Sequence, residues 1–183
     1  MSLISLIALF SGILGVWLTI RQNIWCWPMA LISVVTSGID FYYNRLFGDM
    51  ALQVIYFLQG LYGWLVWHVK KNEAFEAVHM PIKHWLLAAS AIIILWPILY
   101  YILLVVKGNR ALLDALLTAA SLVTTYLMTK KWIENWLLWV LIDATYIILY
   151  VVSGLWSYAL LYLVFTGMAA YGWIQWKEIA SKK

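Results

Sequence analysis

One acidic residue among aromatic side chains is the part of this sequence best suited to bind a small molecule. Trp136, Trp139, Asp143, Tyr146 and Tyr150 follow one another at steps of three and four residues. That spacing places them on one face of a helix. Aromatic rings attract a cation by about 0.5–2 kcal/mol each, and one carboxylate neutralises its charge. This face therefore predicts a site for a flat organic cation.

Two acids differ in where they lie within their apolar segments. Asp143 lies in the middle of its segment, with no basic residue nearby. Because an Asp at the centre of a membrane helix costs about 2.5–3.5 kcal/mol, we expect a functional role for it. Asp114 lies one turn into its segment, four residues after Arg110. An ion pair at that spacing is equally compatible with a structural role.

Further polar side chains share faces with these acids. The face of Asp114 continues with Thr118, Ser121 and Thr125. An earlier segment has Gln53 and Tyr56 on one face. A polar stripe on a membrane helix faces protein or water and not lipid. We expect these faces to meet in one cavity, so Gln53, Tyr56, Asp114 and Thr118 join Asn135 and the aromatic face as candidate substrate-binding residues.

The composition places these segments in a lipid bilayer. The chain is 66% hydrophobic and only 11% charged, whereas an average soluble domain is roughly 45–50% apolar and about 25% charged. Seven segments approach the length of about 20 residues that spans a bilayer. They are Leu3–Ile20, Ile24–Tyr43, Met50–Trp67, Trp85–Val106, Ala111–Thr129, Ile133–Val152 and Leu155–Trp176.

The basic residues predict the orientation. With alternating crossings, one side carries Arg21, Lys70, Lys71, Lys83, Lys130, Lys131, Lys177, Lys182 and Lys183, and the other carries Arg45, Lys107 and Arg110. Basic loops stay in the cytoplasm, so we expect a cytoplasmic C-terminus and an outside N-terminus. The net charge of +4 is explained by this topology, and no nucleic-acid partner is predicted.

An internal repeat divides the chain. The segment Tyr62–Trp67 returns as Tyr171–Trp176 at an offset of 109 residues, which also pairs Trp27 with Trp136. We predict an all-α membrane protein with two parallel three-helix repeats joined by a linker helix. The first repeat covers residues 1–67, a cytoplasmic loop and the linker helix cover 68–110, and the second repeat covers 111–183. Parallel repeats with a substrate site near mid-membrane are a common transporter plan.

Several classes of function lack their sequence signals. The chain has no Gly-rich phosphate loop, no HExxH and no Ser/His/Asp arrangement, so we predict no enzyme, no metal site and no cofactor. His68, His79 and His84 lie in or beside the one long loop, His68–His84, which we expect to be a solvated connector. Cys26 is expected to be a small core residue. The tryptophans that end the repeated segments suit an interfacial belt or packing.

A family resemblance joins these features. The motif Glu134-Asn135-Trp136-Leu137-Leu138-Trp139, followed by Asp143, strongly resembles the signature of the Pnu family of bacterial vitamin transporters. Gln53-Val54 and the ending Tyr62-Gly63-Trp64 extend the resemblance over the chain. It implies seven helices in a three-plus-one-plus-three order in the bacterial cytoplasmic (inner) membrane, with a cavity between the triplets. It also implies a homo-oligomer, foremost a trimer, and facilitated diffusion of a vitamin that a cytoplasmic kinase traps by phosphorylation.

The resemblance also implies residue roles and a substrate range. Asn135, Trp136 and Trp139 match the family motif, and Gln53 matches its glutamine on the third span, whereas Gly60 departs from members that have an amide there. PnuC-type members carry nicotinamide riboside, and relatives carry thiamine, riboflavin or deoxynucleosides. Nicotinamide riboside and thiamine both contain a cationic aromatic ring, so both remain open as substrates.

Two other classes remain open beside a carrier. An ion channel needs a continuous polar lining or rings of charge, whereas the second half offers one acid in an aromatic face. A non-transporting membrane subunit would use the same helices for packing alone.

Overall fold

The computed structural model describes residues 3–45, 47–72, 75–105 and 111–181, and this part of the chain is almost entirely helical. No β-strand occurs within those ranges. The elements are α1 (Leu3–Ile20), α2 (Cys26–Tyr43), α3 (Phe47–Val69), the 3-10 turn η1 (Lys70–Asn72), α4 (Ile82–Val105), α5 (Ala111–Thr129), α6 (Asn135–Val152) and α7 (Trp156–Ala180).

All seven predicted apolar segments are confirmed as helices. The bounds predicted for α1 and α5 agree to the residue, and the others differ by a few residues. Five helices are long and apolar enough to cross a membrane, namely α1, α3 from Asp49 onward, α4, α5 and α6. The helices α2 and α7 are not among these five within the described residues.

The chain forms two compact units, residues 1–76 and 77–183. The linker helix α4 therefore belongs to the same unit as α5, α6 and α7. In the sequence-based division, the connector and α4 form a separate region over 68–110, and that three-part division stays a prediction.

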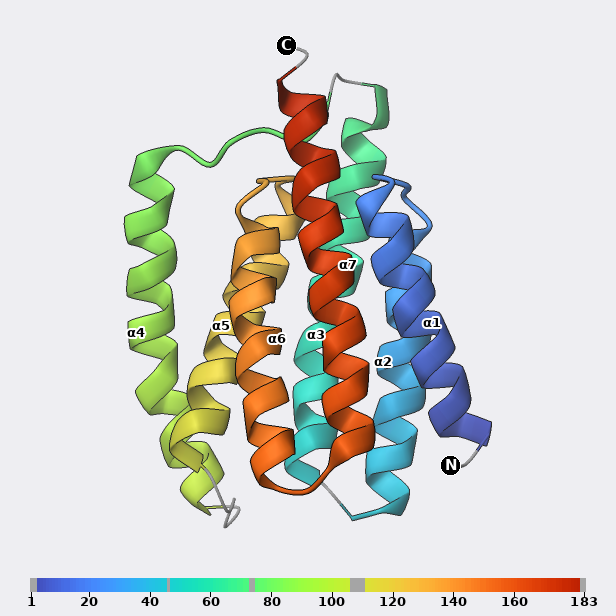
Figure 1. Cartoon of the computed structure of the whole chain (residues 1–183), viewed down its shortest axis with the longest axis vertical. Helices are drawn as coiled ribbons and strands as arrows, with labels where there is room; N and C mark the ends of the chain where they lie inside the picture. Colours follow the sequence, from blue (N-terminus) through green and yellow to red (C-terminus); the bar gives the residue numbers. More distant parts are fainter. Residues whose placement is uncertain (1–2, 46, 73–74, 106–110, 182–183) are drawn as a thin grey trace. The chain divides into compact units, whose positions relative to one another are not determined.

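In the first unit, α2 packs against both α1 and α3 (Figure 1). The α1–α2 contact is close because Gly15 lies against the backbone of α2, where an added Cβ would be 3.5 Å from Ala30 N. Two hydroxyl groups tie the same helices together. Ser33 Oγ donates to Ala8 O at 2.8 Å, and Ser5 Oγ donates to Asp40 Oδ2 at 3.1 Å. Asp40 thus has a structural partner.

In the second unit, α4 packs along α5, α5 along α6, and α6 along α7 (Figure 1, green to red). The most enclosed of these helices is α5, whose buried positions include Thr118 and Ser121. The prediction that the polar stripe of α5 faces protein is confirmed at these two positions. A small core joins Met80, Ala88, Val123 and Leu127.

The turns of the two units repeat the same geometry at the offset of 109 residues. Gln22 and Lys131 lie in the first turn of each triplet and have positive φ angles of 52° and 53°. The next turns contain Arg45 at φ 59° and Gly154 at φ 72°. Left-handed backbone costs roughly 1–2 kcal/mol for a residue with a Cβ. Its recurrence at both pairs of positions indicates that α1–α3 and α5–α7 turn alike.

Candidate functional site

The aromatic face of α6 surrounds one buried acid. Asp143 is only 6% exposed. Trp139 precedes it by one turn and Tyr146 follows it by one turn, and both are half-buried. A carboxylate held in apolar surroundings needs a counter-charge or a proton. The face is therefore able to take a cation.

Trp136 lies at the start of the same face, but its ring is packed against α7. Its indole meets Trp176 edge-to-face, with ring centroids 5.3 Å apart at 85°. Gly172, one turn before Trp176, leaves the room for this ring, because an added Cβ would lie 2.6 Å from Trp136 Cδ2. Trp136 and Trp176 are 2% and 0% exposed. We name this arrangement of Trp136, Gly172 and Trp176 the second Trp–Gly–Trp lock.

The first unit contains an equivalent lock of Trp27, Gly63 and Trp67. Trp27 and Trp67 meet edge-to-face at 5.5 Å and 89°. A Cβ at Gly63 would overlap the six-membered ring of Trp27. The repeated Tyr-Gly-Trp endings of the sequence therefore mark a close packing contact between two helices. The sequence leaves an interfacial belt and packing open as roles for those tryptophans. Trp67 and Trp176 are packed and not part of an interfacial belt.

Asn135 begins α6 and is fully buried. Its Nδ2 donates to Trp132 O at 2.6 Å, whereas its Oδ1 has no hydrogen-bond partner within the described residues. A buried acceptor without a partner costs about 1–3 kcal/mol. Asn135 Oδ1 can therefore accept a hydrogen bond from a ligand hydroxyl or amide.

The neighbouring helix α5 contributes a second polar face. Thr118 is buried and Asp114 is half-buried, one turn earlier on the same helix. The predicted partner of Asp114, Arg110, lies outside the described residues. Because α5 packs against α6, these hydroxyl and carboxyl groups belong to the same unit as Asp143.

Beyond Asp143, the aromatic face continues as a stack of tyrosines. Tyr146 lies 4.7 Å from Tyr162 of α7 between ring centroids, and Tyr150 lies 5.3 Å from Tyr158 with nearly parallel rings at 27°. Tyr150 and Tyr162 are 5.4 Å apart. Periodicity predicted the α6 members of this stack. It did not indicate the partners on α7.

Gln53 and Tyr56 lie on α3 in the first unit, and both are half-buried. Gly38 of α2 lies against Gln53, where an added Cβ would be 3.5 Å from Gln53 Cβ. The structure therefore places these two candidates on one helix. The other candidates all lie in the second unit, and they are Asn135, Trp136, Trp139, Asp143, Tyr146, Asp114 and Thr118.

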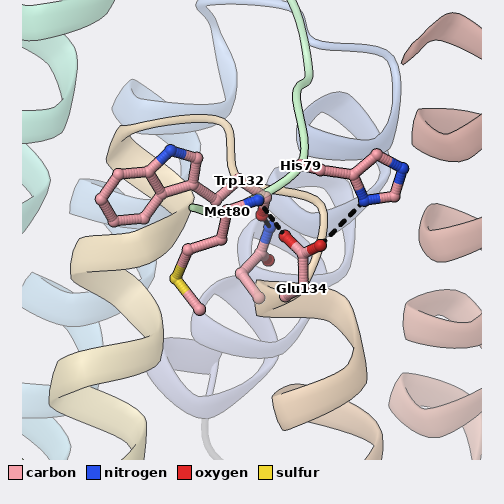
Figure 2. A network of polar contacts seen from close by, with 5 residues as sticks. His79, Met80, Trp132 and Glu134 are labelled. Atoms are coloured by element: carbon pink, nitrogen blue, oxygen red, sulfur yellow. Dashed lines mark hydrogen bonds and ion pairs between the residues drawn. The ribbon is translucent and has the colours of Figure 1, made fainter. Parts of the chain in front are cut away.

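A short extended segment, Ala77–Met80, crosses the turn between α5 and α6, and we call it the strap. Val78 N donates to Lys131 O at 3.1 Å, and Ile133 N donates to Val78 O at 3.0 Å. Figure 2 shows the carboxylate of Glu134 beneath this segment, bonded at Oε2 by Met80 N at 2.8 Å and paired at Oε1 with His79 Nδ1 at 2.9 Å.

The strap differs from the solvated connector that the sequence suggested. Ala77 and Met80 are 0% and 5% exposed, because Met80 enters the core of the second unit. His79 is on the surface as predicted, but His84 is half-buried, with its ring 4.6 Å from that of Trp132. The sequence contains one sign of the strap, because apolar residues lie inside a charged loop. No periodic pattern indicates which segment of the chain the strap pairs with.

A model of one protein family, described as nicotinamide mononucleotide transporter, matches residues 2–178. The nicotinamide riboside transporter PnuC of Escherichia coli (strain K12) is 26% identical over 211 residues, which cover 100% of this chain and 88% of that protein. The riboflavin/roseoflavin transporter RibM of Streptomyces davaonensis is 23% identical over 177 residues, covering 90% of this chain and 80% of that protein.

The fold also resembles a crystal structure of the vitamin B3 transporter PnuC. The TM-score is 0.79 at 23% sequence identity, with 98% of this chain and 82% of that chain covered. At this identity the likeness establishes the helical fold.

Proposed function

Because this chain belongs to the nicotinamide mononucleotide transporter family, we propose that it carries nicotinamide riboside across the bacterial cytoplasmic (inner) membrane. The family consists of membrane transporters and not of enzymes. Relatives that span the whole of this chain are nicotinamide riboside transporters. Five helices apolar enough to cross a membrane agree with a multi-pass protein.

The observation that best supports this cargo is the buried carboxylate of Asp143 on an aromatic face. Nicotinamide riboside presents a flat pyridinium ring with one positive charge. The ring can stack on Trp139 while Asp143 supplies the counter-charge, and each aromatic contact adds about 0.5–2 kcal/mol. A neutral ligand would leave the cost of burying Asp143 uncompensated.

The remaining candidates have complementary roles in this proposal. Asn135 Oδ1 accepts a hydrogen bond from the ribose or the carboxamide, since it has no other partner among the described residues. The site is bordered on α5 by Asp114 and Thr118 and on α6 by Tyr146. Gln53 and Tyr56 complete it from the first repeat of a three-plus-one-plus-three arrangement. Trp136 acts mainly by holding α6 against α7.

Two other vitamins are the alternatives. Riboflavin is favoured by the similarity to RibM, and thiamine is favoured by its cationic ring. Purified protein titrated with all three compounds, with tryptophan fluorescence as the readout, separates them. Tighter binding of riboflavin or thiamine than of nicotinamide riboside would overturn the proposed cargo.

We also propose facilitated diffusion without ion coupling. Coupled carriers use a second intramembrane group that changes charge or binds the ion. Among the described residues Asp143 is the one acid in the middle of a helix, because Asp40, Asp49, Asp114 and Glu178 lie near helix ends. Net uptake in cells then depends on a cytoplasmic kinase that phosphorylates the vitamin.

Uptake into reconstituted vesicles tests this mode with the membrane potential clamped. We expect nicotinamide riboside to equilibrate at equal concentrations, unaffected by a pH or sodium gradient, and to accumulate only when a kinase and ATP are enclosed. Clamping matters because a potential acts on the cationic substrate itself by about 2.3 kcal/mol per 100 mV. Accumulation driven by a gradient alone would contradict facilitated diffusion.

Orientation and assembly complete the proposal. The bias of basic residues supports a cytoplasmic C-terminus and an outside N-terminus. A reporter that is active only in the cytoplasm should work when fused after Lys183 and fail before Met1. We propose a homo-oligomer, foremost a trimer, and native mass spectrometry in detergent measures its subunit number.

A further inference from the structure

The strap is bonded to Glu134, the residue directly before Asn135, where the candidate site begins. Glu134 is the residue that precedes α6, and Asn135 and Trp136 follow it directly. A carboxylate at a helix N-terminus usually caps its own helix. Glu134 makes no such cap. Instead, both of its oxygens bond to the strap, at Met80 N and His79 Nδ1.

The bonds of Glu134 differ in exposure. The side chain of Glu134 is 9% exposed and that of His79 is 60% exposed. The bond from Met80 N is buried, so the loss of its acceptor leaves a buried N–H without a partner, at a cost of about 1–3 kcal/mol. The bond to His79 faces solvent and should contribute less.

Within the described residues, the first repeat has no equivalent of this arrangement. The residue at the position of Glu134 is Trp25, which is 62% exposed and also makes no side-chain cap. The turn geometry is otherwise the same, with Trp27 N donating to Ile24 O at 3.2 Å and Trp136 N donating to Ile133 O at 3.1 Å. The same turn geometry therefore occurs in the first repeat without bonds of this kind from a carboxylate.

We propose that Glu134 is a positioning residue for the transport site: by bonding the strap to the first turn of α6, it holds Asn135 in place to receive the substrate and Trp136 in place against α7. The inference rests on the proposed function. Asn135 is the residue most affected, because its Nδ2 bonds to Trp132 O and Trp132 pairs with Val78 of the strap in a parallel bridge. Displacement of the strap thus moves the carbonyl that orients the Asn135 amide.

Two readouts test the proposal on the full-length protein in detergent. Hydrogen–deuterium exchange of residues 77–80 and 134–138 reports the strap and the first turn of α6 without any ligand. Titration with nicotinamide riboside reports the site. If wild-type protein does not bind this compound, the proposed cargo fails while the exchange measurement still tests the strap.

The variants separate positioning from general stability. Glu134→Ala should accelerate exchange in both segments and weaken nicotinamide riboside binding by about tenfold, as expected for a buried polar group left unpaired. Glu134→Gln should restore both, since the amide oxygen still accepts from Met80 N and the amide N–H can donate to His79 Nδ1. His79→Ala should have a small effect. In vesicles, Glu134→Ala should raise KM, whereas mere loss of folded protein lowers the maximal rate alone.

Two controls match these variants. Trp25→Ala alters the equivalent residue of the first repeat, and Glu178→Gln neutralises an exposed carboxylate near the end of α7. Both should leave exchange in residues 77–80 and nicotinamide riboside affinity unchanged.

The proposal has clear contrary results. Unchanged exchange of residues 77–80 in Glu134→Ala would show that Glu134 does not hold the strap. Faster exchange with unchanged affinity would show that the strap does not position the site. If Glu134→Ala cannot be purified, Glu134→Met replaces it, because a Met side chain likewise removes the acceptor of Met80 N. Affinity equal to wild type in Glu134→Met would overturn the inference in the same way.

Discussion

The first and last three helices place different side chains at equivalent positions of one scaffold. At the offset of 109 residues, Asn135 corresponds to Cys26, Trp139 to Ala30 and Asp143 to Val34. The turn geometries and the Trp–Gly–Trp locks are instead common to α1–α3 and α5–α7.

This comparison separates two kinds of residue within one repeated unit. The backbone conformations of the turns and the residues of the two locks recur in both copies, because both copies must pack in the same way. Residues able to recognise a charged ligand occur mainly in the second copy. Under the proposed function, the second triplet contributes most of the chemistry, and the first contributes support together with Gln53 and Tyr56.

The largest effects should come from filling the two locks. Gly63→Ala and Gly172→Ala each force an indole out of its place, and overpacking of this kind costs about 1–3 kcal/mol. Both variants should lower the thermal unfolding temperature in detergent, and Gly172→Ala should also weaken nicotinamide riboside binding because Trp136 precedes the site. Gly167→Ala on α7 is the matched control, since an added Cβ there meets nothing within 4 Å. Destabilisation by Gly172→Ala alone would break the equivalence of the locks.

The acid that distinguishes the second triplet should give the next largest effect. Asp143→Asn keeps the shape and removes the charge, so affinity for nicotinamide riboside should fall by about tenfold, or 1.4 kcal/mol. Affinity for an uncharged analogue with a reduced ring should change much less. Thr145→Val, at a half-buried position on the same helix whose hydroxyl bonds only to Leu141 O of its own helix, serves as the control. Equal losses for both ligands would make Asp143 a folding residue and weaken the contrast with Val34.

Trp139, which replaces Ala30 of the first triplet, should have a moderate effect. Trp139→Ala should weaken nicotinamide riboside binding by about 1 kcal/mol, whereas Trp139→Phe should retain most of the affinity because a ring is still present. Fluorescence titration of both variants measures the difference. If Trp139→Phe binds as poorly as Trp139→Ala, stacking is not the role of this residue.

The smallest effects should come from the turn that uses Arg45 in one copy and Gly154 in the other. Gly154→Ala places a Cβ at φ 72° and should cost about 1 kcal/mol of unfolding free energy. Arg45→Gly relieves the same strain at φ 59° and should stabilise the protein by up to about 1 kcal/mol. Thermal unfolding in detergent measures both. Stabilisation by Gly154→Ala, or destabilisation by Arg45→Gly, would mean that the two turns are held by different forces.

Much of the helical scaffold was predictable, because the length of an apolar segment and the position of its polar ends are local properties of the chain. The bounds of α1 and α5 follow from them directly. The face of Asp143 followed from periodicity in the same way. Whether its residues meet Gln53 and Tyr56 in one cavity stays a prediction.

Two features of the candidate site were not predictable, because both depend on pairing between distant segments. Periodicity places Trp136 on the face of Asp143, but only the position of Gly172 shows where its ring packs. The pairing of Val78 with Trp132 has no periodic signal at all. Glu134 therefore seemed to be only one member of a motif, although its carboxylate bonds to the strap.

The strap also has a consequence for how the protein is made. Residues 77–80 leave the ribosome before the turn that they bind, and synthesis of the intervening chain takes on the order of 3–10 s. During that interval α4 and α5 must both be inserted, because the strap precedes α4 and its partner turn follows α5. The strap can close only if this helix pair has crossed the membrane and returned to the same side. Its pairing with Lys131 and Ile133 thus discriminates a correctly inserted helical hairpin from one in which α4 or α5 has failed to insert.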